Sequence, residues 1–225
     1  MTFVLSLFPG LDLLGHSFEE AGFCVVRGPD PLWGGDVRAF HPPAGVFDGV
    51  IGGPPCQPFS SSRNIAGRST VVDLIPEFVR VVNEAMPRWI VMENVFGARH
   101  HGSIPAAWHP VVLRDWDCGG ETHRKRIIWT APFEITRPPH REGTPSLSVM
   151  ASTARRGRTS AYANDKRFLP GYFPIEEYER LQGFPGITAA LRRASASKRV
   201  CVHLIGNGVP HAMGKLIAEA AKNFQ

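Results

Sequence analysis

Paired cysteines, long apolar runs and a complete dinucleotide-binding glycine motif are all missing from this chain, and each absence narrows the classes of protein it can belong to. The four cysteines among its 225 residues form no C-x-x-C pair, which argues against a zinc ribbon or a disulfide framework. No apolar run approaches the length of a membrane span, and the first residues lack the basic flank of a signal peptide. We therefore expect reduced thiols, no metal, no membrane association and a cytoplasmic location.

The composition is otherwise that of a globular protein, with a hydrophobic fraction of 43%. A net charge of +5 and a sequence pI near 9.3 mildly favour a polyanionic partner. The length suits one core, or a core with a small appended lobe. There is no internal repeat.

Short apolar strands alternate with amphipathic segments, which is typical of an α/β fold. We expect strands within residues 2–8, 23–26, 47–51, 88–92, 111–118 and 127–129. We expect helices at 13–22, 71–84, 174–183 and through 213–220, and a loop at 97–110. In such folds the turn after the first strand brings backbone close to a nucleotide-like ligand.

A single cysteine lies at the tip of the loop that follows the third strand. Cys56 comes after two glycines and two prolines and precedes Gln57, Pro58 and Phe59. A loop of this composition lies at the surface, so the thiol is poorly placed for a core and well placed to meet a substrate as a nucleophile. An incidental surface cysteine is the alternative interpretation.

A carboxylate and two arginines mark the ends of two later strands. Glu93 follows four apolar residues and points toward the crevice where α/β sheets bind ligands, a position that suits proton donation. Arg124 and Arg126 have the spacing of one strand face, where two guanidiniums could hold a phosphate or a base carbonyl. A helix cap or a surface charge is the alternative for Glu93.

Two polar segments are basic. Residues 60–70 contain Arg63 and Arg68, and residues 132–174 combine arginines and lysines with interleaved aromatic side chains. This chemistry suits a nucleic-acid contact surface, with a solvated loop and a disordered linker as the respective alternatives.

Seven short motifs, in a fixed order along the whole chain, resemble those of the DNA cytosine-5 methyltransferase family, of the small phage or bacterial type. They occupy residues 7–11, 35–37, 53–60, 92–95, 124–126, 177–185 and 206–209. A single one of these motifs can arise by chance, whereas six or seven in the same order are highly specific for the family. The chain departs from the family where Asp12-Leu13 replaces Gly-Gly, where Thr122 replaces a glutamine, and where Asp30 stands for the acid after the second strand.

The resemblance implies an α/β, Rossmann-like S-adenosylmethionine-dependent methyltransferase fold, with a mostly parallel twisted sheet, helices on both faces and a small loop-rich target-recognition region. It implies S-adenosylmethionine as methyl donor and S-adenosylhomocysteine as product. The implied catalytic residues are Cys56, Glu93, Arg124 and Arg126. The implied cofactor-binding residues are Phe8, Pro9, Gly10, Leu11, Asp30, Asp36, Val37, Pro55, Leu74, Asn207, Gly208 and Val209. The nucleic-acid contacts that we expect are Gln57, Ser60, Arg63, Arg68, Arg155, Arg156, Arg158, Lys166 and Arg167.

We expect residues 1–131 to form the catalytic and cofactor-binding core, residues 132–194 the target-recognition region, and residues 195–225 a segment that returns to the core. The resemblance implies double-stranded DNA as the partner and a monomer in a bacterial or phage-infected cell, with a cognate restriction endonuclease as a candidate second partner. Two alternatives stay open: a transfer-RNA cytosine-5 methyltransferase and a non-catalytic DNA-binding protein on a decayed methyltransferase fold. A flavodoxin-like or dehydrogenase enzyme would leave the Pro-Pro-Cys-Gln loop without a purpose.

Overall fold

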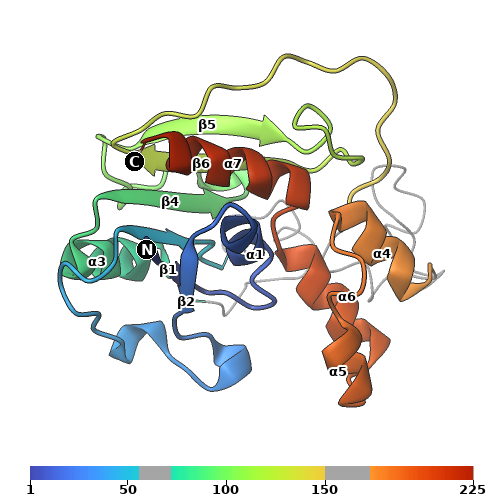
Figure 1. Cartoon of the computed structure of the whole chain (residues 1–225), viewed down its shortest axis with the longest axis horizontal. Coiled ribbons are helices and arrows are strands. Elements are labelled where there is room, and N and C mark those ends of the chain that lie inside the picture. The colour runs from blue at the N-terminus through green and yellow to red at the C-terminus, as the bar shows by residue number, and fades with distance from the viewer. Residues whose placement is uncertain (56–71, 150–172, 225) are drawn as a thin grey trace.

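The computed structural model describes residues 1–55, 72–149 and 173–224, which form a central sheet flanked by helices (Figure 1). The strands are β1 (Phe3–Leu7), β2 (Cys24–Arg27), β3 (Gly49–Gly52), β4 (Trp89–Asn94), β5 (His109–Arg114) and β6 (Lys125–Ala131). The α-helices are α1 (Leu13–Glu20), α3 (Ile75–Ala85), α4 (Ile175–Gln182), α5 (Ala189–Arg193), α6 (Lys198–Asn207) and α7 (His211–Phe224). Three short 3₁₀ turns are η1 (Pro31–Trp33), η2 (Val37–Ala39) and η4 (Phe96–Ala98).

The six strands have the order β2-β1-β3-β4-β6-β5. The first four in this order are mutually parallel, and β6 runs antiparallel between β4 and β5. The expectation of a mostly parallel sheet is therefore confirmed. The carboxyl ends of β1, β3, β4 and β5 and the beginning of β6 meet at one edge, where ligands bind in open α/β sheets.

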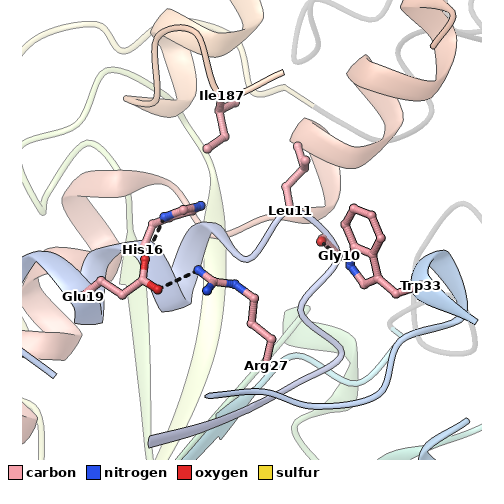
Figure 2. Close-up of a pocket in the computed structure, with 7 residues that line it drawn as sticks. All are labelled: Gly10, Leu11, His16, Glu19, Arg27, Trp33 and Ile187. Atoms are coloured by element: carbon pink, nitrogen blue, oxygen red, sulfur yellow. Dashed lines mark hydrogen bonds and ion pairs between the residues drawn. The ribbon is translucent and has the colours of Figure 1, made fainter. Parts of the chain in front are cut away.

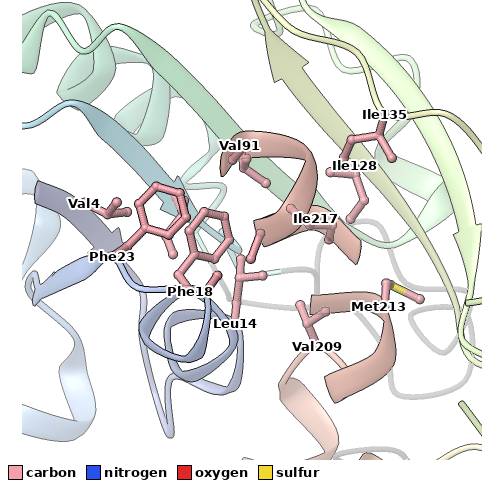
Figure 3. Packing of buried hydrophobic residues seen from close by; sticks show 14 of the residues in the cluster. Val4, Leu14, Phe18, Phe23, Val91, Ile128, Ile135, Val209, Met213 and Ile217 are labelled. Atoms are coloured by element: carbon pink, nitrogen blue, oxygen red, sulfur yellow. The ribbon is translucent and has the colours of Figure 1, made fainter. Parts of the chain in front are cut away.

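Alternate residues of each strand face opposite sides of the sheet and enter different apolar clusters. Val4 and Ile51 pack with α1 and α7, whereas Leu5 and Val50 pack with α3. Figure 3 shows the first of these clusters, in which the rings of Phe18 and Phe23 lie beside side chains from α7. Helices thus cover both faces of the sheet. This is why its central strands are apolar at consecutive positions: both faces of each strand are buried.

The turn between β1 and α1 follows local sequence rules. Asp12 caps α1, and its carboxylate accepts a hydrogen bond from the Gly15 amide at 3.1 Å. Gly22 adopts a φ of 98° just beyond the helix, and the Gly22 and Phe23 amides bond back to the last helical carbonyls. This is the left-handed helix ending that glycine favours, as the sequence predicts.

Two expected elements have different bounds in the structure. Helix α3 begins at Ile75 and not at residue 71, because Pro76 can occupy only a first helical turn and the Asp73 carboxylate accepts from the Ile75 amide at 3.0 Å. Strand β5 covers residues 109–114 and not 111–118. The loop expected at 97–110 therefore ends before residue 109, and its first residues belong to η4. The strand tolerates Pro110 at the sheet edge, and the Asp115 carboxylate closes a turn by accepting from Thr122 at 2.9 Å and 2.7 Å.

Helices α4, α5 and α6 gather beyond the carboxyl edge of the sheet, to the right in Figure 1. Tyr178 and Leu181 of α4 pack with Cys201 and Ile205 of α6 in a third apolar cluster, which Leu11 of the β1–α1 turn also contacts. We call this group the helical lobe. The expected division at residues 131 and 194 stays a prediction: α6 packs on α4, whereas α7 packs on α1.

Within residues 1–55, 72–149 and 173–224, no helix has the length and apolar character needed to cross a membrane. The same residues contain no group of three or more His, Cys, Asp or Glu side chains arranged to hold a metal ion. The three described cysteines, Cys24, Cys118 and Cys201, are free thiols.

Candidate active site

The end of β4 places a buried carboxylate beside an arginine of β6. Glu93 is only 7% exposed, and its Oε1 lies 2.7 Å from Nε of Arg126. The register explains this ion pair: Glu93 lies opposite Ile128, so Arg126 is its diagonal neighbour on the same face. An antiparallel β6 is what brings these two strand ends together.

The chain that leads to Cys56 is held next to this pair. Asn94, fully buried, donates from Nδ2 to the carbonyl of Pro54 at 3.1 Å, and its Oδ1 accepts from the Val95 amide at 2.8 Å. A Cβ on Gly53 would come within 2.9 Å of the Glu93 Oε2, so a larger residue there would displace the carboxylate. The described chain stops at Pro55, and Cys56 itself lies outside the described residues.

Arg124 differs from Arg126 in its surroundings. Its side chain is 2% exposed. Its guanidinium donates to the carbonyls of Val149 at 2.7 Å, Gly206 at 2.8 Å and Gly208 at 2.8 Å. Arg124 therefore ties the start of β6 to the helical lobe, and the two arginines of the motif have different partners.

Several expected cofactor residues converge at the carboxyl ends of β1, β2 and β3. The Gly10 amide donates to the Asp30 carboxylate at 3.1 Å, and the Gly35 amide donates to the Asp30 carbonyl at 3.0 Å. Val37 is buried in an apolar cluster that Phe8 and Leu74 also contact. The turn after β1, the acid after β2 and the Gly-Asp-Val segment thus lie together.

The exposed carboxylate of Asp36 closes the same region. Its hydrogen bonds from Arg38 lower the pKa of Asp36 to about 2, so it is ionised near neutral pH. The Gly10 turn has a φ of 55°, and no atom lies within 4 Å of where a Cβ would stand. The backbone there faces open space, as a ligand-binding turn requires.

The last of the seven motifs, residues 206–209, packs against α1. Gly208 lies so close to Leu13 that a Cβ would overlap its side chain, and Val209 is buried in the α1–α7 cluster. Asn207, the last residue of α6, has Nδ2 at 3.3 Å from the His203 ring. These residues lie against α1 and not against Asp36 or Leu74 in any described contact.

A pocket of about 360 Å³ opens beside the β1–α1 turn (Figure 2). Gly10 and Leu11 line it, and the remaining lining residues were not expected from the sequence: His16, Glu19, Arg27, Trp33 and Ile187. Trp33 is 62% exposed, and its indole N–H donates to the Gly10 carbonyl at 3.3 Å. An exposed tryptophan in a Pro/Gly turn after the second strand was the available signal for this site.

Asp12 explains one departure from the family motif. Burial raises the pKa of its carboxyl, against the hydrogen bond from Ser6 and the charge of Arg27. Its Oδ1 accepts from the Ser6 hydroxyl at 2.7 Å, and its Oδ2 lies 2.9 Å from Nε of Arg27. An acid that replaces a glycine in a buried turn needs such partners, and β2 provides one.

The expected nucleic-acid contacts, Gln57, Ser60, Arg63, Arg68, Arg155, Arg156, Arg158, Lys166 and Arg167, all lie outside the described residues.

The sheet order, the glycine turn after β1 and the acid at the end of β4 define a Rossmann-like methyltransferase fold. Over its full length the chain superposes on a Schizosaccharomyces pombe Dnmt2 methyltransferase with a TM-score of 0.65, at 14% identity and with 100% of both chains covered. At this identity the likeness concerns the fold alone.

The sequence comparisons identify the family. Residues 35–106 match the model of the C-5 cytosine-specific DNA methylases. The chain is 44% identical over 116 residues to the Type II methyltransferase M.HgiGI of Herpetosiphon aurantiacus, covering 42% of this chain and 91% of that protein. It is 31% identical over 115 residues to the Type II methyltransferase M.DdeI of Desulfomicrobium norvegicum, covering 42% of this chain and 28% of that protein. The chain belongs to the C-5 cytosine-specific DNA methylase family.

The matches leave part of the larger relatives uncovered. The chain spans 28% of M.DdeI, 48% of M.AquIA and 36% of M.NgoPII.

Proposed function

We propose that this protein is an S-adenosylmethionine-dependent DNA methyltransferase that methylates C5 of cytosine in a short target sequence. The observation that carries the proposal is the buried Glu93–Arg126 pair, held beside the Pro54 carbonyl two residues before Cys56. A nucleophile, a proton donor and a cation then share one small site, as the addition chemistry requires.

Cys56 acts as the nucleophile. Its thiolate adds to C6 of the cytosine ring, and the C5–C6 π electrons move onto C5. Glu93 holds a proton at N3, which balances the charge that this addition places on the ring. Arg126 binds the O2 oxygen and stabilises the developing negative charge. After methyl transfer to C5, loss of the C5 proton expels the thiolate and restores the double bond.

The target cytosine must leave the duplex to reach these groups. Glu93 is 7% exposed, and a base stacked inside a DNA helix cannot contact so deeply buried a carboxylate. Base flipping is therefore part of the proposal, with Gln57, Ser60, Arg63 and Arg68 of the following loop as contacts to the DNA.

The residues around Gly10 suit S-adenosylmethionine. Bound there, it supplies a methyl group on a positively charged sulfur, and S-adenosylhomocysteine is the product. Asp30 would offer a carboxylate to the sugar hydroxyls, and Asp36 would offer one to the adenine amine. The remaining proposed cofactor contacts are Phe8, Pro9, Leu11, Val37, Pro55, Leu74, Asn207, Gly208 and Val209.

Arg124 has a positioning role in this proposal. Its guanidinium donates to the backbone carbonyls of Val149, Gly206 and Gly208, so we assign it the positioning of β6 and give the contact with the base to Arg126. Arg155, Arg156, Arg158, Lys166 and Arg167 remain our proposed DNA contacts of the target-recognition region, residues 132–194.

Double-stranded DNA is the proposed partner, and the Type II names of the relatives add a cognate restriction endonuclease as a candidate. We propose a monomer that acts in the cytoplasm of a bacterial or phage-infected cell.

The test is bisulfite sequencing of host DNA with and without expression of the chain, using Cys56→Ala as a matched inactive variant. We expect protected cytosines in one short sequence context for the wild type and none for Cys56→Ala, which should still bind the cofactor. Protection by the variant would remove Cys56 as nucleophile. Methylation of transfer RNA alone would move the substrate to RNA, and cofactor binding without any methylation would favour a non-catalytic protein.

A further inference from the structure

A row of cations and aromatic rings extends from the Glu93–Arg126 pair along the ends of β5 and β6. The Arg99 guanidinium and the Lys125 ammonium lie 4.5 Å and 4.2 Å from the centre of the Phe96 ring. Further along, the Arg141 guanidinium lies 3.9 Å from the Trp116 ring. We call six residues the basic strip: Phe96, Arg99, Arg114, Trp116, Lys125 and Arg141.

Two cations of the basic strip face each other directly. Arg114 and Lys125 are register partners on antiparallel strands, and both are exposed. Like charges at directly opposite positions destabilise a sheet. Within the described part of the chain, none of the four cations of the basic strip makes an ion pair, whereas Arg80, Arg180 and Arg192 pair with carboxylates. Lys125 packs on the Phe96 ring and Arg114 lies near Asp117, but neither contact removes the repulsion between the two facing cations.

A pocket of about 430 Å³ lies between these cations. Arg114, His123, Lys125 and His140 line it, and Asp117 is its acidic group. The Asp117 carboxylate is buried and already accepts from His140 at 2.9 Å and from the Arg141 amide at 3.2 Å. The pocket thus keeps a positive character that suits an anion.

The basic strip and the candidate active site adjoin at the beginning of β6. Lys125 and Arg126 are consecutive on β6 and point to opposite faces, one toward Phe96 and the other toward Glu93. Phe96 comes two residues after Asn94 and is 38% exposed. Since successive strand residues rise only about 3.3 Å, a DNA strand that crosses this edge of the sheet can present a base to Arg126 on one face and phosphates to Lys125 and Arg114 on the other.

We propose that the basic strip binds the sugar–phosphate backbone of the DNA strand that carries the target cytosine, with a phosphate in the pocket between Arg114 and Lys125. The choice of DNA rests on the proposed function. Arginine and lysine contact phosphates without reading sequence, and exposed aromatic rings beside cations suit unpaired bases. The unfavourable like-charge pair is then offset when a phosphate lies between the two side chains.

The test compares two double variants that remove the same charge. Arg114→Gln/Lys125→Gln changes the basic strip, and Arg88→Gln/Lys215→Gln changes an arginine just before β4, at the opposite edge, and a lysine on α7. Fluorescence anisotropy with a labelled duplex measures the dissociation constant from low to moderate salt. We expect the slope of log K against log salt to become shallower by about 2 in the strip variant, because each phosphate contact contributes about 0.9. We expect little change in the control.

Two further measurements separate binding from folding. The strip variant should melt at the same temperature as the wild type or slightly higher, because the like-charge pair is gone. Its methyl transfer at saturating DNA should stay within about twofold, while the KM for DNA rises several-fold on every sequence. A lower melting temperature together with an unchanged salt slope would show a structural role and overturn the proposal.

The outcomes also separate this proposal from the proposed function. A wild-type protein that binds DNA through the basic strip but methylates no cytosine would contradict the function and support the strip. Methylation with identical salt slopes in the strip variant and the control would support the function and overturn the strip. A wild-type protein that does not bind the duplex would overturn both.

Discussion

The two halves of the carboxyl edge of the sheet differ in how far their charged side chains are paired with each other. At the β1–α1 turn, Asp12 is held by the Ser6 hydroxyl, the Gly15 amide and Arg27, and Arg27 also pairs with Glu19 at 2.8 Å. Every one of these charges is matched within the fold.

At the ends of β4, β5 and β6, charge is matched sparingly. Glu93 has the Arg126 guanidinium as its ion-pair partner, and Arg114 and Lys125 have no ion pair within the described residues. Charge that is neutralised internally supports the fold, whereas exposed charge without an ion-pair partner is available to a charged ligand. The difference agrees with our proposal that the groups that react with the base lie at the ends of β4 and β6.

The largest effect that would test this difference is loss of the Glu93 carboxyl. We expect Glu93→Gln to slow methyl transfer by about 10²–10⁴-fold, the usual contribution of a general acid. The measurement is incorporation of a radiolabelled methyl group into duplex DNA. Glu121→Gln is the matched control, since Glu121 is an exposed acid that pairs with Arg180, and its rate should equal that of the wild type. A near wild-type rate for Glu93→Gln would remove Glu93 from the acid role.

The two arginines of the same motif should separate stability from turnover. Arg124→Lys keeps the charge but loses the fork that spans the lobe carbonyls, so we expect the free energy of unfolding to fall by about 2 kcal/mol. Arg126→Lys keeps an ion pair with Glu93 and should change that free energy by less than about 1 kcal/mol, while turnover drops. Urea denaturation and single-turnover methylation measure the two quantities. An equal loss of stability in both variants would contradict the different roles that we assign to Arg124 and Arg126.

The smallest expected effect concerns pH and the β1–α1 turn. Because burial raises the pKa of Asp12 in the folded protein above its ordinary value of 3.8, its protonated form favours the folded state. That contribution is complete below pH 3.8 and is lost as the pH rises through the raised pKa. We expect the melting temperature of the wild type to fall relative to that of Asp12→Asn across this range. Parallel melting curves for the two proteins at all pH values would contradict the assigned shift.

The parts of the fold that the sequence predicted correctly are those that depend on residues close together in the chain. The approximate positions of the strands, the Gly22 helix ending and the position of Glu93 at a strand end follow from short-range periodicity and turn residues. Pro76 also carried a local signal, since it restricts where α3 can begin. The consecutive apolar residues from Val200 to Cys201 and Val202 did not distinguish a helix from a strand, so α6 had no expected type.

The sequence by itself determined the class of fold and the family, and it supplied the groups that we propose as chemically active, because motif order and residue type are local properties. Tertiary structure alone decided which groups meet. Arg124 binds the Gly206 carbonyl 82 positions away, so its difference from Arg126 is invisible in the motif that contains both. The opposition of Arg114 and Lys125 depends on the register of β5 and β6, and Asp12 meets Arg27 only because β2 pairs with β1. Contacts of this kind depend on how the strands are ordered and aligned, and no short stretch of sequence encodes that alignment.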